Sequence, residues 1–265
     1  MWSRRVFKTK AKAILSHTYW MSFAVCLVGG IFVGGYSVAS GRVSQPSGMQ
    51  DYFRNGMHFS GGSYDFFNLY WGMLLGLFTA AAIAISCIGL IYHFFVSGPV
   101  EVGVSRYFLD NRKGKCAFGT LFYGFSNGKY IEVVKSIAWR YLFQLLWTLL
   151  FLIPGIIKYY SYYMVPYILA DNPGIGYQRA LKLSMDMTRG HKFKIFVLQL
   201  SFIGWYLLGL ICCFVGTLFV NPYYRATMAE MYGTLRNNAV AQGFCSAAEL
   251  NLTQGDYAAD TYVPQ

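Results

Sequence analysis

Charged residues are scarce in this sequence, and their scarcity excludes an ordinary water-soluble protein. Asp, Glu, Lys and Arg make up 12% of the 265 residues, whereas about a quarter is usual for a soluble domain. Hydrophobic residues make up 55%, and the mean hydropathy is +0.38. Acidic residues are the scarcest, because 11 Asp and Glu stand against 22 Lys and Arg, for a net charge of +11. The hydropathy favours anionic membrane lipid, and not nucleic acid, as the partner of this positive charge.

Motifs for catalysis, metal binding and cofactor binding are also missing. The sequence has no H-E-x-x-H, no Walker A loop and no G-x-G-x-x-G fingerprint, so the common metal and nucleotide chemistries lack an anchor. The six cysteines show neither the C-x-x-C pairs of a zinc site nor the density of a disulfide scaffold. One formal match, the G-x-S-x-G around Ser126, lacks the strand, turn and helix of a nucleophile elbow. We therefore expect no enzyme activity, no metal and no cofactor, and we rank a membrane enzyme third among the possible functions.

Long apolar runs are present instead, and they predict an all-α, polytopic membrane helix bundle. About 20 apolar residues suffice for one transmembrane helix. We expect about six transmembrane helices in three hairpins over residues 19–235, together with amphipathic interfacial helices. The expected spans are residues 19–39, 69–97, 136–153, 156–170, 195–211 and 215–235.

Two details of these spans have alternatives. The last two spans could be one long helix, and the first could be a cleaved signal peptide, although its basic region is long for that. A Pro-Gly pair at Pro154 predicts a tight turn between the third and fourth spans.

The distribution of basic residues predicts the orientation. Sixteen of the 22 Lys and Arg lie in residues 1–18, 98–135 and 174–194, and basic loops favour the cytoplasmic side. Both termini should therefore be cytoplasmic, and the loop from Ser40 to Asn68 should be external. We expect a multi-pass protein of the bacterial plasma membrane, with a polar, disordered tail over residues 236–265.

Two of the basic segments are amphipathic and should lie on the inner membrane surface. The first is residues 1–18. The second, residues 174–194, combines apolar residues at helical spacing with basic residues that we expect to bind anionic lipid headgroups. These basic residues are Arg179, Lys182, Arg189 and Lys192. The alternative is that they only set the orientation.

An arginine falls in the middle of the last expected span, and its position predicts a pocket. A charge there costs several kcal/mol unless it is paired, hydrated or at the interface. We expect this arginine to face the interior of the bundle, with Gln144, Gln199, Glu101 or a ligand phosphate as its partner. The candidate pocket residues are Arg225, Tyr223, Tyr224, Glu230, Gln144 and Gln199. Glu230 is on the same helix but faces away from Arg225 on an ideal helix. The alternatives to a pocket are a structural ion pair or a misplaced helix boundary.

Three prolines, Pro99, Pro166 and Pro222, accompany the second helix of each expected hairpin. Proline in a membrane helix frees a carbonyl group and bends the helix, and such bends often line cavities. The alternative is that proline is simply common in transmembrane helices.

Four segments resemble one known family. They are AKAILSHTYW (residues 11–20), IPGIIKYYSYYMVPYILADNP (153–173), LSFIGWYLLG (200–209) and GTLFVNPYY (216–224). Up to about residue 235 the chain is similar to bacterial integral membrane proteins catalogued as domain of unknown function 975. The resemblance implies a multi-span helical membrane protein and brings no catalytic residues. It also suggests a distant likeness to membrane domains attached to some glycerophosphodiester phosphodiesterases.

These observations together predict a non-enzymatic membrane protein with a role in envelope homeostasis. Its expected ligand is lipid or a membrane partner, which could be a second copy of the chain. A transporter or channel for a small solute or lipid is the alternative, because prolines and polar residues lie within the expected spans.

Overall fold

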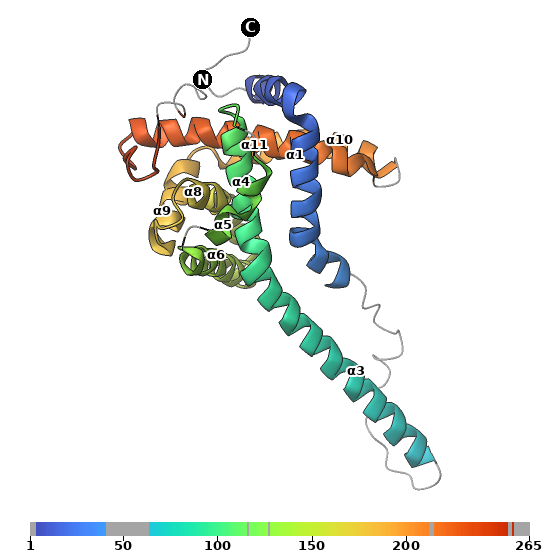
Figure 1. The fold of residues 1–265 in the computed structure, drawn as a ribbon. Coiled ribbons are helices and arrows are strands. Elements are labelled where there is room, and N and C mark those ends of the chain that lie inside the picture. The colour runs from blue at the N-terminus through green and yellow to red at the C-terminus, as the bar shows by residue number, and fades with distance from the viewer. Residues whose placement is uncertain are drawn as a thin grey trace. The chain divides into compact units, whose positions relative to one another are not determined.

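The structure is a computed structural model, and all regular elements of the residues it describes are helices (Figure 1). The described residues are 4–40, 64–115, 117–126, 128–211, 215–253 and 256. The chain divides into two compact units, residues 34–93 and the remainder, residues 1–33 with 94–265. The expected all-α class is confirmed for this part of the chain.

The smaller unit contains α3 (Tyr64–Tyr92), an apolar helix that is exposed on all sides. Leu77, Phe78 and Ile88, for example, are 66–69% exposed. A helix that is apolar all round requires a cover of lipid or protein. Most of the expected external loop before it lies outside the described residues.

Three helices are long and apolar enough to cross a membrane, and they indicate membrane association. These are Arg4–Gly30, Tyr70–Asn111 and Lys192–Gly209. They overlap the first, second and fifth expected spans. Among the described residues, the other three expected spans do not meet the same criteria of length and hydropathy.

In the larger unit, the central helix is α4 (Gly98–Asn111), in a region that we expected to be a basic loop. Val100, Val102 and Phe108 of α4 are at most 2% exposed. A 3₁₀ helix, η2 (Phe118–Phe122), and the short α5 (Tyr123–Ser126) pack against it. The loop prediction was wrong for residues 98–111, because they form a buried helix. Arg106 and Arg112 of the expected loop pair with carboxylates of other helices.

The region of the expected third and fourth spans contains two helices that pack against each other, followed by a break. α6 (Tyr130–Leu150) ends at Phe151, whose extended backbone leads into α7 (Leu152–Ser161). The Gln144 side-chain amide donates a hydrogen bond to the Gly155 carbonyl at 2.8 Å, which ties α7 to α6. The chain resumes as α8 (Val165–Asp171), which is buried along its whole length. The expected span 156–170 is therefore two short helices and not one.

The three prolines differ in their positions. Pro166 lies in the first turn of α8, where proline is tolerated because those N–H groups have no partner in the helix. Pro99 is the second residue after a π-helix, His93–Ser97, in a helical stretch that runs from Tyr70 to Asn111. Pro222 lies inside α11 (Val215–Ala241). Pro166 thus begins a helix, whereas Pro99 and Pro222 lie within longer helical stretches.

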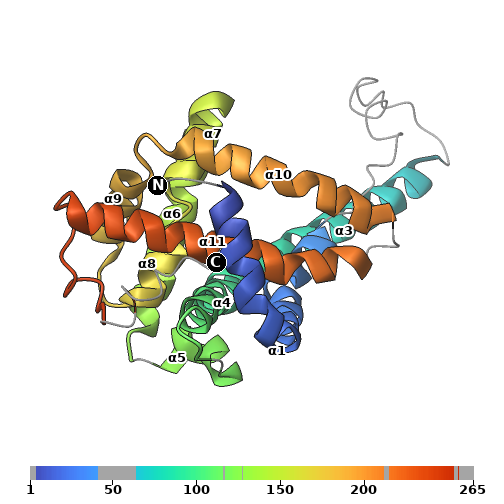
Figure 2. The same cartoon turned by 90° about the horizontal axis from the view of Figure 1, so that it is seen from above.

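The last long helices, α10 (Lys192–Ile211) and α11, run side by side (Figure 2). A Cβ atom built on Gly209 would lie 2.8 Å from the backbone of Gly216, so only glycine permits this approach. The region 195–235 is thus two helices. Before them, α9 (Tyr177–Thr188) packs on α6, where Trp139 and Tyr177 stack with ring centroids 5.2 Å apart.

The N-terminal helix α1 (Arg4–Ser40) is kinked at Thr18, where the basic segment was expected to end. Phe7, Ala11 and Leu15 are spaced four residues apart and are buried, and the Lys8 ammonium lies 4.5 Å from the ring centroid of Phe202 in α10. The apolar face of this segment therefore packs on protein, whereas we expected it to lie on the membrane surface.

The chain after residue 235, which we expected to be disordered, is folded in its described part. α11 continues to Ala241, and the following turns place Asn251 so that it donates to the Asp171 carbonyl at 3.1 Å. Asn172 in turn donates to the Glu249 carbonyl at 2.9 Å. Residues 242–253 thus bind to the end of α8.

Close backbone packing of η2 against α4 gives a stability prediction. A Cβ atom on Gly103 would overlap the carbonyl oxygen of Leu121, and a backbone atom cannot move aside as a side chain can. We expect Gly103→Ala to lower the free energy of unfolding in detergent by about 1–3 kcal/mol or more. Gly204→Ala is the matched control, because nothing lies within 4 Å of its added methyl, and it should be neutral or stabilising by about 1 kcal/mol. Equal stabilities of the two variants would contradict this packing.

Candidate functional site

Burial changes along α6 and along α11, and this change divides the larger unit into two parts. In α6, Val133, Ile137 and Arg140 are buried, whereas the leucines from Leu142 to Leu150 are 50–82% exposed. Apolar side chains of α7 and α10 are exposed as well, among them Ile153 and Leu208. A surface of this kind suits lipid and not water. The residues of α11 after Arg225 are mostly buried.

A cavity of about 250 Å³ lies at the level where both helices change from exposed to buried. Its lining comes from four helices and the break after α7. The lining residues are Glu101 of α4, Arg140, Tyr141 and Gln144 of α6, Tyr159 of α7, Tyr163 of the break, and Tyr224 and Arg225 of α11.

The cavity carries more positive than negative charge. Arg140 and Arg225 are its two cations, and Glu101 is the one carboxylate in its lining. Glu101 Oε1 lies 3.7 Å from Arg140 Nη1. No described residue forms a hydrogen bond or ion pair with Arg225. A guanidinium group in such a place is a ready donor for a phosphate or carboxylate.

Tyrosine hydroxyl groups complete the lining and are held in a hydrogen-bond chain. The hydroxyl groups of Tyr163 and Tyr224 lie 2.6 Å apart. Gln199 of α10 donates to the Tyr224 hydroxyl at 3.1 Å and accepts from the Tyr160 hydroxyl at 3.2 Å. The Tyr224 ring therefore has a fixed position beside Arg225.

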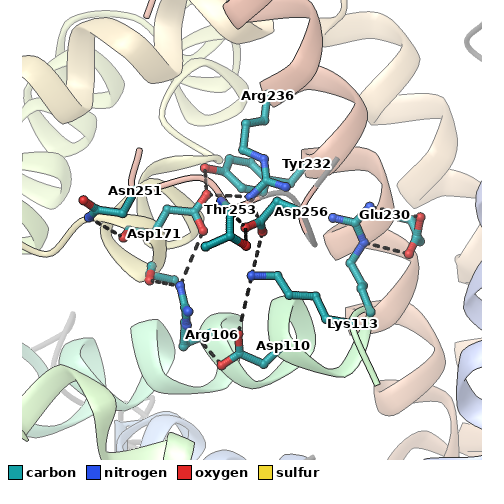
Figure 3. Close-up of polar contacts among 12 residues, drawn as sticks. Arg106, Asp110, Lys113, Asp171, Glu230, Tyr232, Arg236, Asn251, Thr253 and Asp256 are labelled. Carbon is teal, nitrogen blue, oxygen red and sulfur yellow. Dashed lines mark hydrogen bonds and ion pairs between the residues drawn. The ribbon is translucent and has the colours of Figure 1, made fainter. Parts of the chain in front are cut away.

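A buried ionic network lies further along the same two helices, α4 and α11 (Figure 3). The Asp171 carboxylate accepts hydrogen bonds from Arg236 at 2.9 Å and Tyr232 at 2.8 Å, both in α11. Arg106 Nη1 of α4 lies 3.6 Å from the same carboxylate. The side chains of Asp171 and Arg236 are only 3% and 1% exposed. The network thus joins α4, α8 and α11 beneath the surface.

The C-terminal segment adds another carboxylate to this network. Asp256 Oδ1 lies 2.7 Å from Lys113 Nζ, and the Thr253 hydroxyl donates to Asp256 Oδ2 at 2.7 Å. Burial by itself would raise the pKa of Asp256, but the hydrogen bonds from Lys113 and Thr253 lower it to about 2. Asp256 is therefore ionised at physiological pH and neutralises cations of the network.

Comparison with known proteins gives one match. Residues 136–239 match the model of a family described as "Protein of unknown function (DUF975)". This part of the chain is a DUF975 domain. No curated protein matches the chain significantly, and no solved structure does.

The DUF975 region contains every cavity residue except Glu101, and it also contains Asp171 and Arg236 of the ionic network. The resemblance expected from the sequence motifs is thereby confirmed. The family itself brings no assigned activity, so the chemistry must be argued from the site.

Three of the six predicted pocket residues, Arg225, Tyr224 and Gln144, line the cavity. Gln199 lies behind Tyr224 through its hydrogen bond. Tyr223 packs against Phe202, with ring centroids 5.2 Å apart.

Glu230 lies outside the cavity and binds Arg112, the residue that follows α4, at 2.7 Å. The five-residue offset from Arg225 turns it to another side of α11. Including it among the pocket residues was therefore wrong.

Sequence reasoning missed Arg140, Tyr141, Tyr159 and Tyr163. A signal for Arg140 was present, because it lies four residues before Gln144 and so on the same face of one helix. Tyr159 and Tyr163 share the same spacing. Glu101, which we had considered only as a partner of Arg225, lines the cavity beside it.

The four basic residues expected to bind lipid headgroups differ in their surroundings. Arg179 Nη2 lies 2.9 Å from Glu249 Oε2 and donates to the Phe244 carbonyl at 2.7 Å, so it holds the C-terminal segment. Its hydrogen bond lowers the pKa of Glu249. Arg189 pairs with Asp186 at 3.3 Å at the surface. Lys182 is exposed, and Lys192 is partly buried.

Ser126 does not have the setting of a nucleophile elbow. It lies in α5, and the element before it is the 3₁₀ helix η2, where an elbow needs a strand. Its hydroxyl group donates to the Tyr123 carbonyl at 3.4 Å.

The buried pair of Asp171 and Arg236 gives a second stability prediction. We expect Asp171→Asn to lower the free energy of unfolding by about 3–5 kcal/mol, because it leaves a buried guanidinium without its main counter-charge. Glu132→Gln is the matched control. It removes an exposed carboxylate 3.9 Å from Lys135 and should cost less than about 1 kcal/mol.

A double-mutant cycle measures the pair directly. Asp171→Asn combined with Arg236→Met should cost clearly less than the sum of the two single changes, because the double variant buries no unpaired charge. Additive costs, measured by unfolding in detergent, would show that the two side chains do not stabilise each other.

Proposed function

We propose that this protein is a non-enzymatic, multi-pass protein of the bacterial plasma membrane that binds an anionic ligand in the cavity around Arg225. The observation that supports the proposal most strongly is the cavity's unmatched charge. Two guanidinium groups and one carboxylate line it, and the Arg225 guanidinium has no hydrogen-bond or ion-pair partner among the described residues. An anion would supply the missing partner. We propose that this binding serves envelope homeostasis.

The proposed placement in the membrane follows from the two parts of the larger unit. The exposed apolar surfaces of α6, α7 and α10 lie in hydrocarbon, as two of the three proposed hairpins, α6–α7 and α10–α11. The ionic network and α9 lie on the cytoplasmic side, with both termini, in keeping with the basic residues there. The cavity then lies at the level of the lipid headgroups, where Arg225 meets anions at a smaller desolvation cost than in mid-membrane.

Transport of a small solute or lipid is a second candidate, and the break between α7 and α8 favours it. Interrupted helices at a binding site are typical of secondary transporters. Here the break carries Tyr163, which lines the cavity. Uptake of radiolabelled glycerol 3-phosphate into proteoliposomes that exceeds passive leakage would favour transport over binding alone.

Retention of anionic lipid by purified protein tests the proposal. We expect Arg225→Gln to weaken retention of anionic over zwitterionic lipid, measured by native mass spectrometry, by roughly 10- to 100-fold. That range corresponds to the loss of one charge-assisted hydrogen bond, about 1.5–3 kcal/mol. Lys115→Gln is the control, because it removes the same charge from an exposed position after the end of α4. Equal retention by both variants and the unaltered protein would refute the site.

A further inference from the structure

A second hollow lies next to the cavity, and its lining has a different character. It has a volume of about 370 Å³ and lies along α10, with Tyr160 of α7 and Tyr224 of α11 at its edges. Phe196, Leu200 and Ile203 of α10 line it and are 40–49% exposed. The hollow therefore opens on the exposed apolar surface of α10. We refer to it as the α7–α10 groove. Its apolar lining suits a hydrocarbon chain.

The groove and the cavity share a wall. Tyr224 lines both of them. The hydrogen-bond chain from Tyr160 through Gln199 and Tyr224 to Tyr163 begins at a groove residue and ends at a cavity residue. A polar, positively charged compartment therefore adjoins an apolar one, and their border consists of side chains held in fixed positions.

We propose that the ligand is an anionic phospholipid, with its phosphate beside Arg225 and Arg140 and one acyl chain in the α7–α10 groove. This inference rests on the proposed function and names its ligand class. Charge complementarity places the phosphate in the cavity, and the adjacency of the two hollows on either side of Tyr224 places the chain in the groove. The cavity, at about 250 Å³, is smaller than the pockets of about 300–1,000 Å³ that enclose drug-sized ligands, so it accommodates a headgroup and not a whole lipid.

One more atom of the cavity indicates which kind of headgroup it suits. Gln144 Oε1 is buried and has no hydrogen-bond partner among the described residues, whereas its amide nitrogen is engaged by Gly155. The cavity thus offers an acceptor as well as cationic donors. A headgroup with a free hydroxyl group, such as phosphoglycerol, satisfies both.

Two probes test the binding of the headgroup and the binding of the acyl chain separately. The probes are a short-chain phosphatidylglycerol and glycerol 3-phosphate, each titrated by calorimetry into protein in a neutral detergent. Arg225→Gln should weaken the binding of both probes. Ile203→Trp, which fills the groove, should weaken phosphatidylglycerol at least 10-fold and leave glycerol 3-phosphate unchanged. Leu207→Trp is the control, because Leu207 is an exposed residue of α10 outside the groove.

Each outcome decides between the claims. Unchanged phosphatidylglycerol affinity in Ile203→Trp, with Arg225→Gln still weakened, overturns the chain in the groove but leaves the anion site standing. No effect of Arg225→Gln on either probe overturns both claims. No binding of phosphatidylglycerol to the unaltered protein overturns the phospholipid as the ligand. Phosphatidylglycerol binding that both variants weaken supports the inference even if glycerol 3-phosphate alone does not bind. Leu200→Trp fills the same groove and replaces Ile203→Trp if that variant does not fold.

Discussion

The carboxylate of Asp171 joins three helices, and the positions of the other functional residues follow from this junction. It ends the short α8 and meets Arg236 and Tyr232 of α11 and Arg106 of α4. With the carboxylate buried, the cost of its desolvation is recovered only when these partners keep their geometry. The register of α11 against α4 is thereby set, and Arg225 and Glu101, earlier on the same two helices, come to line one cavity.

Ion pairs distinguish the cations that hold the fold of this strongly basic chain together from the cation that we propose binds a ligand. Arg112, Arg179 and Arg236 each bind a carboxylate at 2.9 Å or less. Arg225 has no such partner among the described residues, although it lies in the same bundle and is half-buried. A half-buried guanidinium group without a hydrogen-bond or ion-pair partner costs free energy unless a ligand or water supplies the missing hydrogen bonds. For this reason we place the ligand at Arg225 and not at the surface cations of α9.

The sequence predicted the helical class, the family and the position of Arg225 at a cavity, because hydropathy and an arginine in an apolar run are local signals. It did not predict that residues 98–111 form the buried centre. Their charges resemble those of a loop until partners such as Asp171 and Glu230, far away in sequence, are known. The same reason explains the tail, since Asp256 and Glu249 have no local sign of the cations they meet. The structure of these parts depends on ion pairs between residues that are far apart in the sequence. A single sequence does not reveal such pairs.

The central claim is that the cavity lies at the boundary between lipid and water, so the depths of residues on either side test it most directly. Spin labels at positions 149 and 182, in protein whose native cysteines are replaced, can be compared in liposomes by their collisions with oxygen and with a water-soluble nickel complex. Leu149 is 82% exposed at the apolar end of α6, and Lys182 is exposed on α9. The account predicts that label 149 is accessible to oxygen but not to nickel, and that label 182 shows the reverse. Equal access of the nickel complex to both labels would contradict it.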